Sequence, residues 1–291
     1  MLRGSLVALI TPFRNGAVDD KAFQSFVDWQ IEQGTEGVVP CGTTGESPTL
    51  THEEHKRVVE LCVEVAKGRV PVIAGTGSNS TAEAIDLTQH AKKAGADAAL
   101  IVTPYYNKPT QEGLYQHYKA INDAVDLPII IYNIPARCVV DMSIATMARL
   151  AKLPNIVGVK DATNDLARPL RTRAAIGKDF AMLSGEDATA MAFMAQDGDG
   201  CISVTANVAP RACADMHQAW RKGEAATAMK INARLLPLHD ALFCETSPAP
   251  VKYACSLLGK STADVRLPLA AASPQAQETV RAAMRSAGLL N

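Results

Sequence analysis

Eight short apolar runs recur along this chain, and most of them lead into a segment with helical periodicity. They carry Val and Ile without strict alternation, which is typical of parallel strands that are buried on both faces. The runs cover residues 5–13, 37–44, 70–77, 98–106, 127–135, 155–162, 180–187 and 200–207. Eight successive strand and helix units predict an α/β fold, the closed (β/α)8 TIM barrel, with the active site at the carboxyl ends of the strands.

The chain has 291 residues, which is more than one barrel of roughly 250 residues requires. Residues 210–222 have the pattern of a closing barrel helix, and Gly223 follows them. Further helical patterns cover residues 224–243, 250–258 and 273–287. We therefore expect a catalytic barrel over residues 1–223 and a C-terminal helical domain over residues 224–291, which covers the outside of the barrel and joins a neighbouring subunit.

Charge and cysteine content narrow the class of protein. The formal net charge is -1 and the charges are interspersed, so no broad charged surface is available for nucleic acid or anionic lipid. The apolar start of the chain stops at Thr11-Pro12, short of the ~18 residues that a membrane span needs. The seven cysteines are dispersed and never spaced as C-x-x-C, which predicts buried thiols in a reducing compartment. We expect a cytoplasmic protein.

The segment His52-Glu53-Glu54-His55 contains metal-binding residue types, but it lacks the histidine spacing of H-E-x-x-H and no third ligand is evident. Thr51 with Glu54 three residues later has instead the pattern of a capping box. We therefore predict the start of a helix here and no metal site.

Lys160 ends the sixth apolar run and is the strongest single indication of function. A lysine in water has a pKa of ~10.4, so an amine that attacks a carbonyl at neutral pH needs apolar or cationic surroundings. Ile156, Val157 and Val159 supply apolar neighbours. The alternative is a lysine that is solvated at the edge of a loop.

Three other strand ends carry polar groups. Tyr132 ends the fifth run, next to the strand of Lys160, where its phenol could carry protons for an imine or simply pack. The segment Gly42-Thr43-Thr44-Gly45-Glu46-Ser47 has the glycines and hydroxyls of a carboxylate cradle, although it could also be a connection without a ligand. It fits neither the P-loop nor the dinucleotide fingerprint. Tyr105-Tyr106 ends the fourth run.

Four motifs in order resemble the dihydrodipicolinate synthase (4-hydroxy-tetrahydrodipicolinate synthase) family. They are Gly42-Thr43-Thr44-Gly45-Glu46-Ser47, Thr103-Pro104-Tyr105-Tyr106-Asn107, Tyr132-Asn133-Ile134-Pro135-Ala136-Arg137 and Gly158-Val159-Lys160-Asp161. The resemblance extends over essentially the whole chain. It implies a class I condensation of pyruvate with L-aspartate β-semialdehyde in lysine and diaminopimelate synthesis, without a metal or another cofactor.

The resemblance also implies roles for individual residues. Lys160 matches the lysine that forms the Schiff base, and Tyr132 matches the tyrosine that moves protons to and from the imine. Thr43 and Tyr106 match the rest of the proton relay, with Tyr106 contributed by the neighbouring subunit. Arg137 matches the residue that receives the carboxylate of the aldehyde substrate, which suits a guanidinium. The positions that hold pyruvate correspond to Thr44, Gly185 and Ile202.

The resemblance further implies a homo-oligomer, a homotetramer built as a dimer of dimers, with feedback inhibition by L-lysine at its dimer interface. The residues that match this second site are Ser47, His52, His55, Asn79, Glu83 and Tyr105. Pro48 stands where a small residue is usual and is expected to weaken lysine binding. Cys138-Val139 replaces the usual Thr-Gly after Arg137, so the resemblance does not specify the conformation of this loop.

Two other functions remain as alternatives. Another pyruvate aldolase of the same superfamily, such as N-acetylneuraminate lyase or a 2-keto-3-deoxy sugar acid aldolase, would share Lys160 and Tyr132. Arg137 and the pair Thr43-Thr44 favour a small aldehyde that carries a carboxylate over a sugar. A non-catalytic barrel that binds keto acids or amino acids is the remote alternative.

Overall fold

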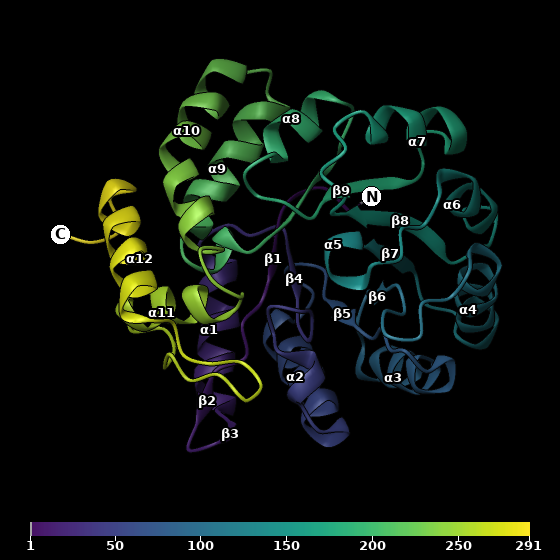
Figure 1. Cartoon of the computed structure of the whole chain (residues 1–291), viewed down its shortest axis with the longest axis horizontal. Helices are drawn as coiled ribbons and strands as arrows, with labels where there is room; N and C mark the ends of the chain where they lie inside the picture. The colour runs from purple at the N-terminus through teal and green to yellow at the C-terminus, as the bar shows by residue number, and fades with distance from the viewer. Residues whose placement is uncertain (1) are drawn as a thin grey trace.

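The computed structural model describes residues 2–291 and contains the expected barrel (Figure 1). Eight parallel strands form one sheet in the order β4-β1-β10-β9-β8-β7-β6-β5, and a bridge between Val38 and Val72 joins its two edges. The strands are β1 (Gly4–Ala8), β4 (Gly37–Val39), β5 (Ile73–Gly75), β6 (Ala98–Val102), β7 (Ile129–Asn133), β8 (Ile156–Asp161), β9 (Ala181–Ser184) and β10 (Gly200–Ser203). The TIM barrel predicted from the apolar runs is confirmed.

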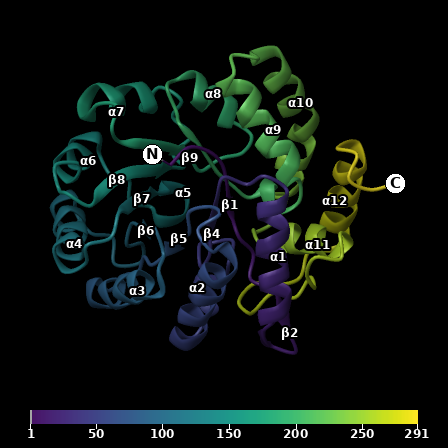
Figure 2. The ribbon, with the colours of Figure 1, turned by 180° about the vertical axis from the view of Figure 1, so that it is seen from behind.

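Helices surround this sheet (Figures 1 and 2). They are α1 (Asp20–Glu32), α2 (His52–Ala66), α3 (Thr81–Ala94), α4 (Gln111–Ala124), α6 (Ile144–Leu150), α7 (Arg168–Ile176), α8 (Ala190–Ala195) and α9 (Pro210–Arg221). The capping box of α2 is confirmed, because Thr51 Oγ1 accepts from Glu54 N at 3.2 Å and the Glu54 carboxylate accepts from Thr51 N at 3.0 Å.

Each strand is shorter than the apolar run that predicted it. The fourth run, residues 98–106, contains a strand that ends at Val102, and the rest of the run forms a loop at the mouth of the barrel. In this loop Thr103 is buried, whereas Tyr105 and Tyr106 are exposed. Short elements that the sequence pattern did not indicate also occur: a hairpin of β2 (Phe13–Arg14) and β3 (Ala17–Val18), α5 (Pro135–Cys138), and the 3-10 turns η1 (Ser47–Thr49) and η2 (Thr205–Asn207).

Alternation along each strand decides which side chains reach the interior. In β7, Ile129 and Ile131 belong to the large core between sheet and helices, whereas Ile130 and Tyr132 belong to a separate core inside the barrel. Both faces are buried, so the run is uniformly apolar even though its residues alternate between two environments. The inner core, which also contains Leu183 and Ile202, forms the floor under the site.

The C-terminal helices α10 (Ala225–Ala241), α11 (Ala249–Leu257) and α12 (Pro274–Ser286) lie on one side of the barrel, in green to yellow in Figure 1. Helix α10 packs on α8, α9 and α12, and Lys260 Nζ stands 4.6 Å from the centre of the Trp29 ring of α1. Gly223 has a φ of 80° between α9 and α10, and we propose it as the boundary of the two parts.

All seven cysteines are free in the described chain, and six of them are buried. Within residues 2–291, none of the helices has both the length and the apolar character of a membrane span.

Candidate active site

Lys160 and Tyr132 lie side by side in the mouth of the barrel. They are register partners on the neighbouring strands β8 and β7, and Lys160 Nζ stands 4.2 Å from the centre of the Tyr132 ring. Only 5% of Lys160 and 6% of Tyr132 is exposed. The alternative of a lysine solvated at a loop edge is therefore wrong. A buried amine against an aromatic ring is in the surroundings that an amine nucleophile needs.

A register shift brings this pair together. Ile129 pairs with Ile156, but Ile130 pairs with Gly158, so Val157 is an extra residue in β8. Without this bulge Lys160 would lie one position farther along and would not face Tyr132.

Because Gly185 has no side chain, Lys160 can pack directly against its backbone. A Cβ atom at this position would lie 3.2 Å from Lys160 Cε and 2.7 Å from the Cβ of Ala162. Any larger residue would therefore push against the amine side chain. Ile202 is fully buried in the inner core beneath, so it supplies an apolar wall at this side of the site.

The glycine-rich turn after β4 is held by its own backbone. Gly45 N donates to Gly42 O at 3.1 Å, Glu46 N donates to Thr43 O at 3.1 Å, and Ser47 N donates to Gly42 O at 3.4 Å. These three amides are used within the turn and are not available to a ligand. Thr44 is buried.

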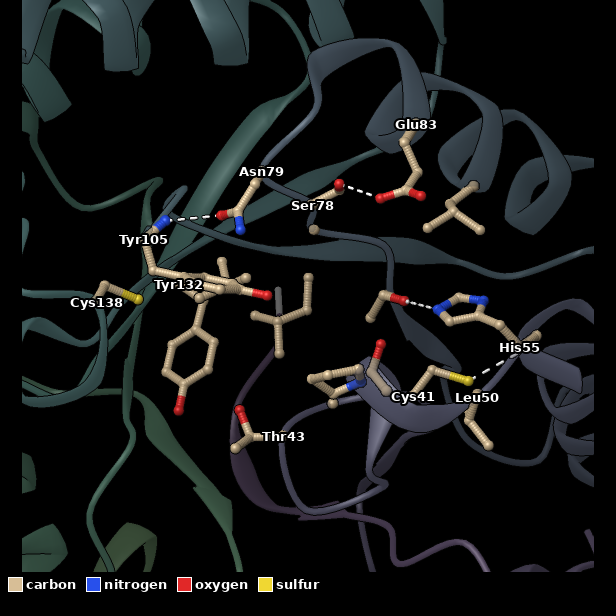
Figure 3. A pocket seen from close by; sticks show the side chains of 18 of the residues that line it. Cys41, Thr43, Leu50, His55, Ser78, Asn79, Glu83, Tyr105, Tyr132 and Cys138 are labelled. Carbon is tan, nitrogen blue, oxygen red and sulfur yellow. Dashed lines mark hydrogen bonds between the residues drawn. The ribbon is translucent and has the colours of Figure 1, made fainter. Parts of the chain in front are cut away.

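One cavity of about 620 Å³ runs from this turn along β5 and β6 (Figure 3). Two of the expected catalytic residues, Thr43 and Tyr132, line it together with Arg137 of the expected substrate-binding residues. The other residues expected at the reaction site do not line it: Lys160, Tyr106, Thr44, Gly185 and Ile202. All six residues of the expected lysine site also line it: Ser47, His52, His55, Asn79, Glu83 and Tyr105. In Figure 3, Tyr132 lies toward one end, whereas Glu83 and His55 lie toward the other. The expected lysine site therefore shares one continuous cavity with Thr43, Tyr132 and Arg137.

Glu83 carries a charged carboxylate in this cavity. The Ser78 hydroxyl donates to it, and His52 Nε2 lies 2.7 Å from its Oε1. These two contacts hold the pKa of Glu83 below its usual range against the opposing effect of burial, with the Ser78 hydroxyl contributing most. Asn79 Oδ1 accepts from Tyr105 N at 2.9 Å, so these two residues are fixed against each other.

His55 is neutral and offers an acceptor. Its Nε2 lies 2.9 Å from the carbonyl oxygen of Gly75, which can only accept, so Nε2 carries the proton. Burial lowers the pKa of His55 to about 4. Its buried Nδ1 has no partner in the described chain and is left as a free acceptor.

The residues of the segment His52-Glu53-Glu54-His55 are engaged in other contacts. His52 contacts Glu83, His55 contacts the Gly75 carbonyl, and the Glu54 carboxylate binds both guanidinium nitrogens of Arg266 at 2.6 Å. Across residues 2–291, no group of three or more possible metal-binding side chains comes together.

The loop after Arg137 has the shape that glycine favours, although Val139 occupies it. Val139 has a φ of 63° and is 73% exposed. A β-branched residue in this region costs about 1–3 kcal/mol of backbone strain. Tyr106 is 89% exposed and does not line the cavity of its own chain.

Residues 1–287 match the profile of the Dihydrodipicolinate synthetase family. The chain belongs to this family. It is 71% identical to the 4-hydroxy-tetrahydrodipicolinate synthase of Rhodospirillum centenum, with 100% of both chains covered. The dihydrodipicolinate synthase of Acinetobacter baumannii, solved in complex with pyruvate, is similar with a TM-score of 0.97 and 49% identity over 100% of both chains. That of Cyanidioschyzon merolae, solved with lysine bound, has a TM-score of 0.95 and 38% identity over 99% of both chains.

Sequence reasoning named Glu46 only as part of the glycine-rich motif and gave no role to Lys252. In the structure they form a fully buried ion pair, with Lys252 Nζ 2.6 Å from Glu46 Oε1. The pair connects α11 of the C-terminal part to the turn that carries Thr43 and Thr44. A single charged residue within the otherwise apolar segment of α11 was the available signal, since a buried lysine needs a partner.

Proposed function

We propose that this chain condenses pyruvate with L-aspartate β-semialdehyde to give 4-hydroxy-tetrahydrodipicolinate, in lysine and diaminopimelate synthesis. The observation that carries the proposal is the buried pair of Lys160 and Tyr132 at the carboxyl ends of two adjacent barrel strands. The relatives that share this fold over the full chain, including one solved in complex with pyruvate, support the same chemistry.

The first half of the reaction uses Lys160. Its amine attacks the keto carbon of pyruvate, and loss of water gives the imine. Loss of a proton from the methyl group then gives an enamine. We propose that the Tyr132 phenol, Thr43 and the partner subunit's Tyr106 pass these protons, while Thr44, Gly185 and Ile202 form the pyruvate pocket.

The second half forms the carbon–carbon bond. The enamine carbon attacks the aldehyde carbon of the second substrate, and the aldehyde oxygen takes up a proton. The amine of that substrate then displaces Lys160 from the imine carbon and closes the ring, so the lysine is regenerated and one water is released overall. We propose that Arg137 binds the carboxylate of the semialdehyde with its guanidinium.

Borohydride trapping tests the imine. Pyruvate with borohydride should leave a reduced three-carbon adduct on the peptide that contains Lys160, measured by mass spectrometry. Lys252 is an internal control, because it is also buried but is held as an ion pair with Glu46 and should remain unmodified. An unmodified Lys160 in active enzyme would reject the proposal. Activity that disappears with chelators would indicate a metal-dependent aldolase.

We further propose that L-lysine inhibits the enzyme by binding in the part of the cavity around Glu83. A ligand with two ammonium groups and a carboxylate needs acceptors and a donor. The charged Glu83 carboxylate and the Ser47 hydroxyl supply acceptors, and the Tyr105 phenol supplies a donor. The relative solved with lysine bound supports this assignment.

A lysine titration of the turnover rate tests this site. Glu83→Ala should lose inhibition and keep turnover. Glu53→Ala is the matched control, because Glu53 lies on the adjacent helix α2 but is not among the residues that line the cavity, so inhibition should persist. Wild-type activity that is indifferent to millimolar lysine would reject the proposal.

We also propose that the enzyme works in the cytoplasm as a homo-oligomer, a dimer of dimers. The wide exposure of Tyr106 supports the assembly, because this side chain can join a relay only across an interface. Sedimentation tests the assembly, since a monomer with full activity would contradict it, and cell fractionation tests the compartment.

A further inference from the structure

A buried guanidinium lies behind the proposed reacting pair. Lys160 and Tyr132 face the interior of the barrel, and the residues that follow them, Asp161 and Asn133, are the next register partners of the same two strands. Alternation turns these two side chains to the outer face. There Arg168, the first residue of α7, contacts the Asp161 carboxylate at the end of β8.

Arg168 connects the end of β8 to the segment of Asp141 and Met142. Its Nε forms an ion pair with Asp161 Oδ2 at 3.1 Å, without the geometry of a hydrogen bond. Its Nη2 lies 3.3 Å from Asp141 Oδ1 and donates to the carbonyl of Met142. Asn133 completes the cluster, because its Nδ2 donates to Asp141 Oδ1 at 2.7 Å and its Oδ1 accepts from Met142 N at 3.0 Å. The Arg168 side chain is 9% exposed and that of Asp161 is 3% exposed, so the contact between these two is weakly screened by water.

We propose, on the basis of the function proposed above, that Arg168 is a positioning residue for the reaction. Its planar guanidinium (the fork) contacts the end of β8, which carries Lys160. Through Asp141 and Asn133 it is also linked to the end of β7, which carries Tyr132. The same contacts to Asp141 and Met142 anchor the segment that follows Arg137. Reacting groups must be held within a fraction of an ångström, so loss of this fork should slow the chemical steps.

The chain contains a matched control on the same helix. Arg173 of α7 is also 9% exposed and also binds two aspartates, with Nε 3.1 Å from Asp197 Oδ2 and Nη2 2.9 Å from Asp199 Oδ2. Asp199 also accepts from Met182 N, near the start of β9, so this cluster lies at the opposite end of the barrel from the site. Loss of Arg173 should therefore affect stability without affecting the reaction.

The experiment compares Arg168→Lys with Arg173→Lys, which both keep the positive charge and lose the fork. Melting temperature, kcat, KM for each substrate and the rate of borohydride trapping with pyruvate are measured. We expect Arg168→Lys to lower kcat and the trapping rate at least tenfold. Arg173→Lys should change kcat and the trapping rate less than twofold, although it should lower the melting temperature by a similar amount as Arg168→Lys.

A second variant keeps the test decisive if Arg168→Lys does not fold. Asp141 is about half exposed, so Asp141→Asn should fold, and we expect at least a threefold rise of KM for the semialdehyde because the anchor of the Arg137 loop is weakened. Wild-type kinetics in Asp141→Asn, or equal effects of the two arginine variants, would overturn the role of Arg168. Failure of the wild-type enzyme to be trapped by pyruvate would instead reject the proposed function.

Discussion

The buried ion pair of Lys252 and Glu46 joins the C-terminal helices (residues 224–291, here called the tail) to the barrel. We expect the loss of either partner alone to lower the free energy of unfolding strongly. Both side chains are completely buried. Lys252 Nζ also donates to the Thr11 carbonyl at 2.8 Å and lies 4.0 Å from the centre of the Phe13 ring, while Glu46 Oε2 accepts from Arg266 N at 2.9 Å. Every polar atom of this pair therefore depends on its neighbours rather than on water.

Lys252→Met leaves the Glu46 carboxylate buried without its cation. Removal of one partner of a buried pair costs about 3–5 kcal/mol. At about 2–4 °C per kcal/mol for a chain of this size, the melting temperature should fall by roughly 6–20 °C. The double variant Lys252→Met with Glu46→Gln removes both charges, so it should recover at least half of this loss, since the desolvation cost of both ions disappears.

Thermal unfolding followed by circular dichroism measures these shifts. Glu54→Gln is the control, because it breaks the ion pair between Glu54 and Arg266, which is partly exposed and also joins barrel to tail. Partly exposed pairs contribute about 0–1 kcal/mol, so its melting temperature should fall by at most about 4 °C. A single variant Lys252→Met that melts within a few degrees of wild type, or a double variant no more stable than the single one, would refute the reasoning.

Three further outcomes are expected. Mixing inactive Tyr106→Phe and Lys160→Ala subunits should restore some activity, and no recovery despite demonstrated subunit exchange would count against a shared site. Arg137→Ala should raise KM for the semialdehyde much more than KM for pyruvate, because only the former loses a bidentate partner, and equal effects would reject that role. Burial lowers the pKa of His217 to about 4 from the ~6.5 of an unfolded chain, so the unfolded state binds the proton first and stability is lost as pH falls from about 6.5 to 4. His217→Gln should flatten the dependence of melting temperature on pH in that window, and an unchanged slope would contradict the assignment.

The sequence by itself determined the order of the eight main strands and the helices between them, and the polar residues that follow these strands. Apolar runs, helical periodicity and the capping box of Thr51 and Glu54 are local patterns, and each element forms where its own residues favour it. The position of Lys160 at the end of a run was readable for the same reason. The loop at Val139 was not, because glycine-like backbone geometry at a valine reflects the contacts that surround the loop rather than its sequence.

Only the tertiary structure decided how these parts meet. The bulge at Val157 sets Lys160 opposite Tyr132, and no local pattern specifies an extra residue in one strand of a buried pair. The ion pair of Glu46 and Lys252 joins residues that are 206 positions apart, and it forms because the tail helix packs over the mouth of the barrel. Register and long-range pairing depend on the packing of the whole molecule, whose free energy is the sum of many contacts between distant segments, whereas the propensity of each segment depends only on its own residues.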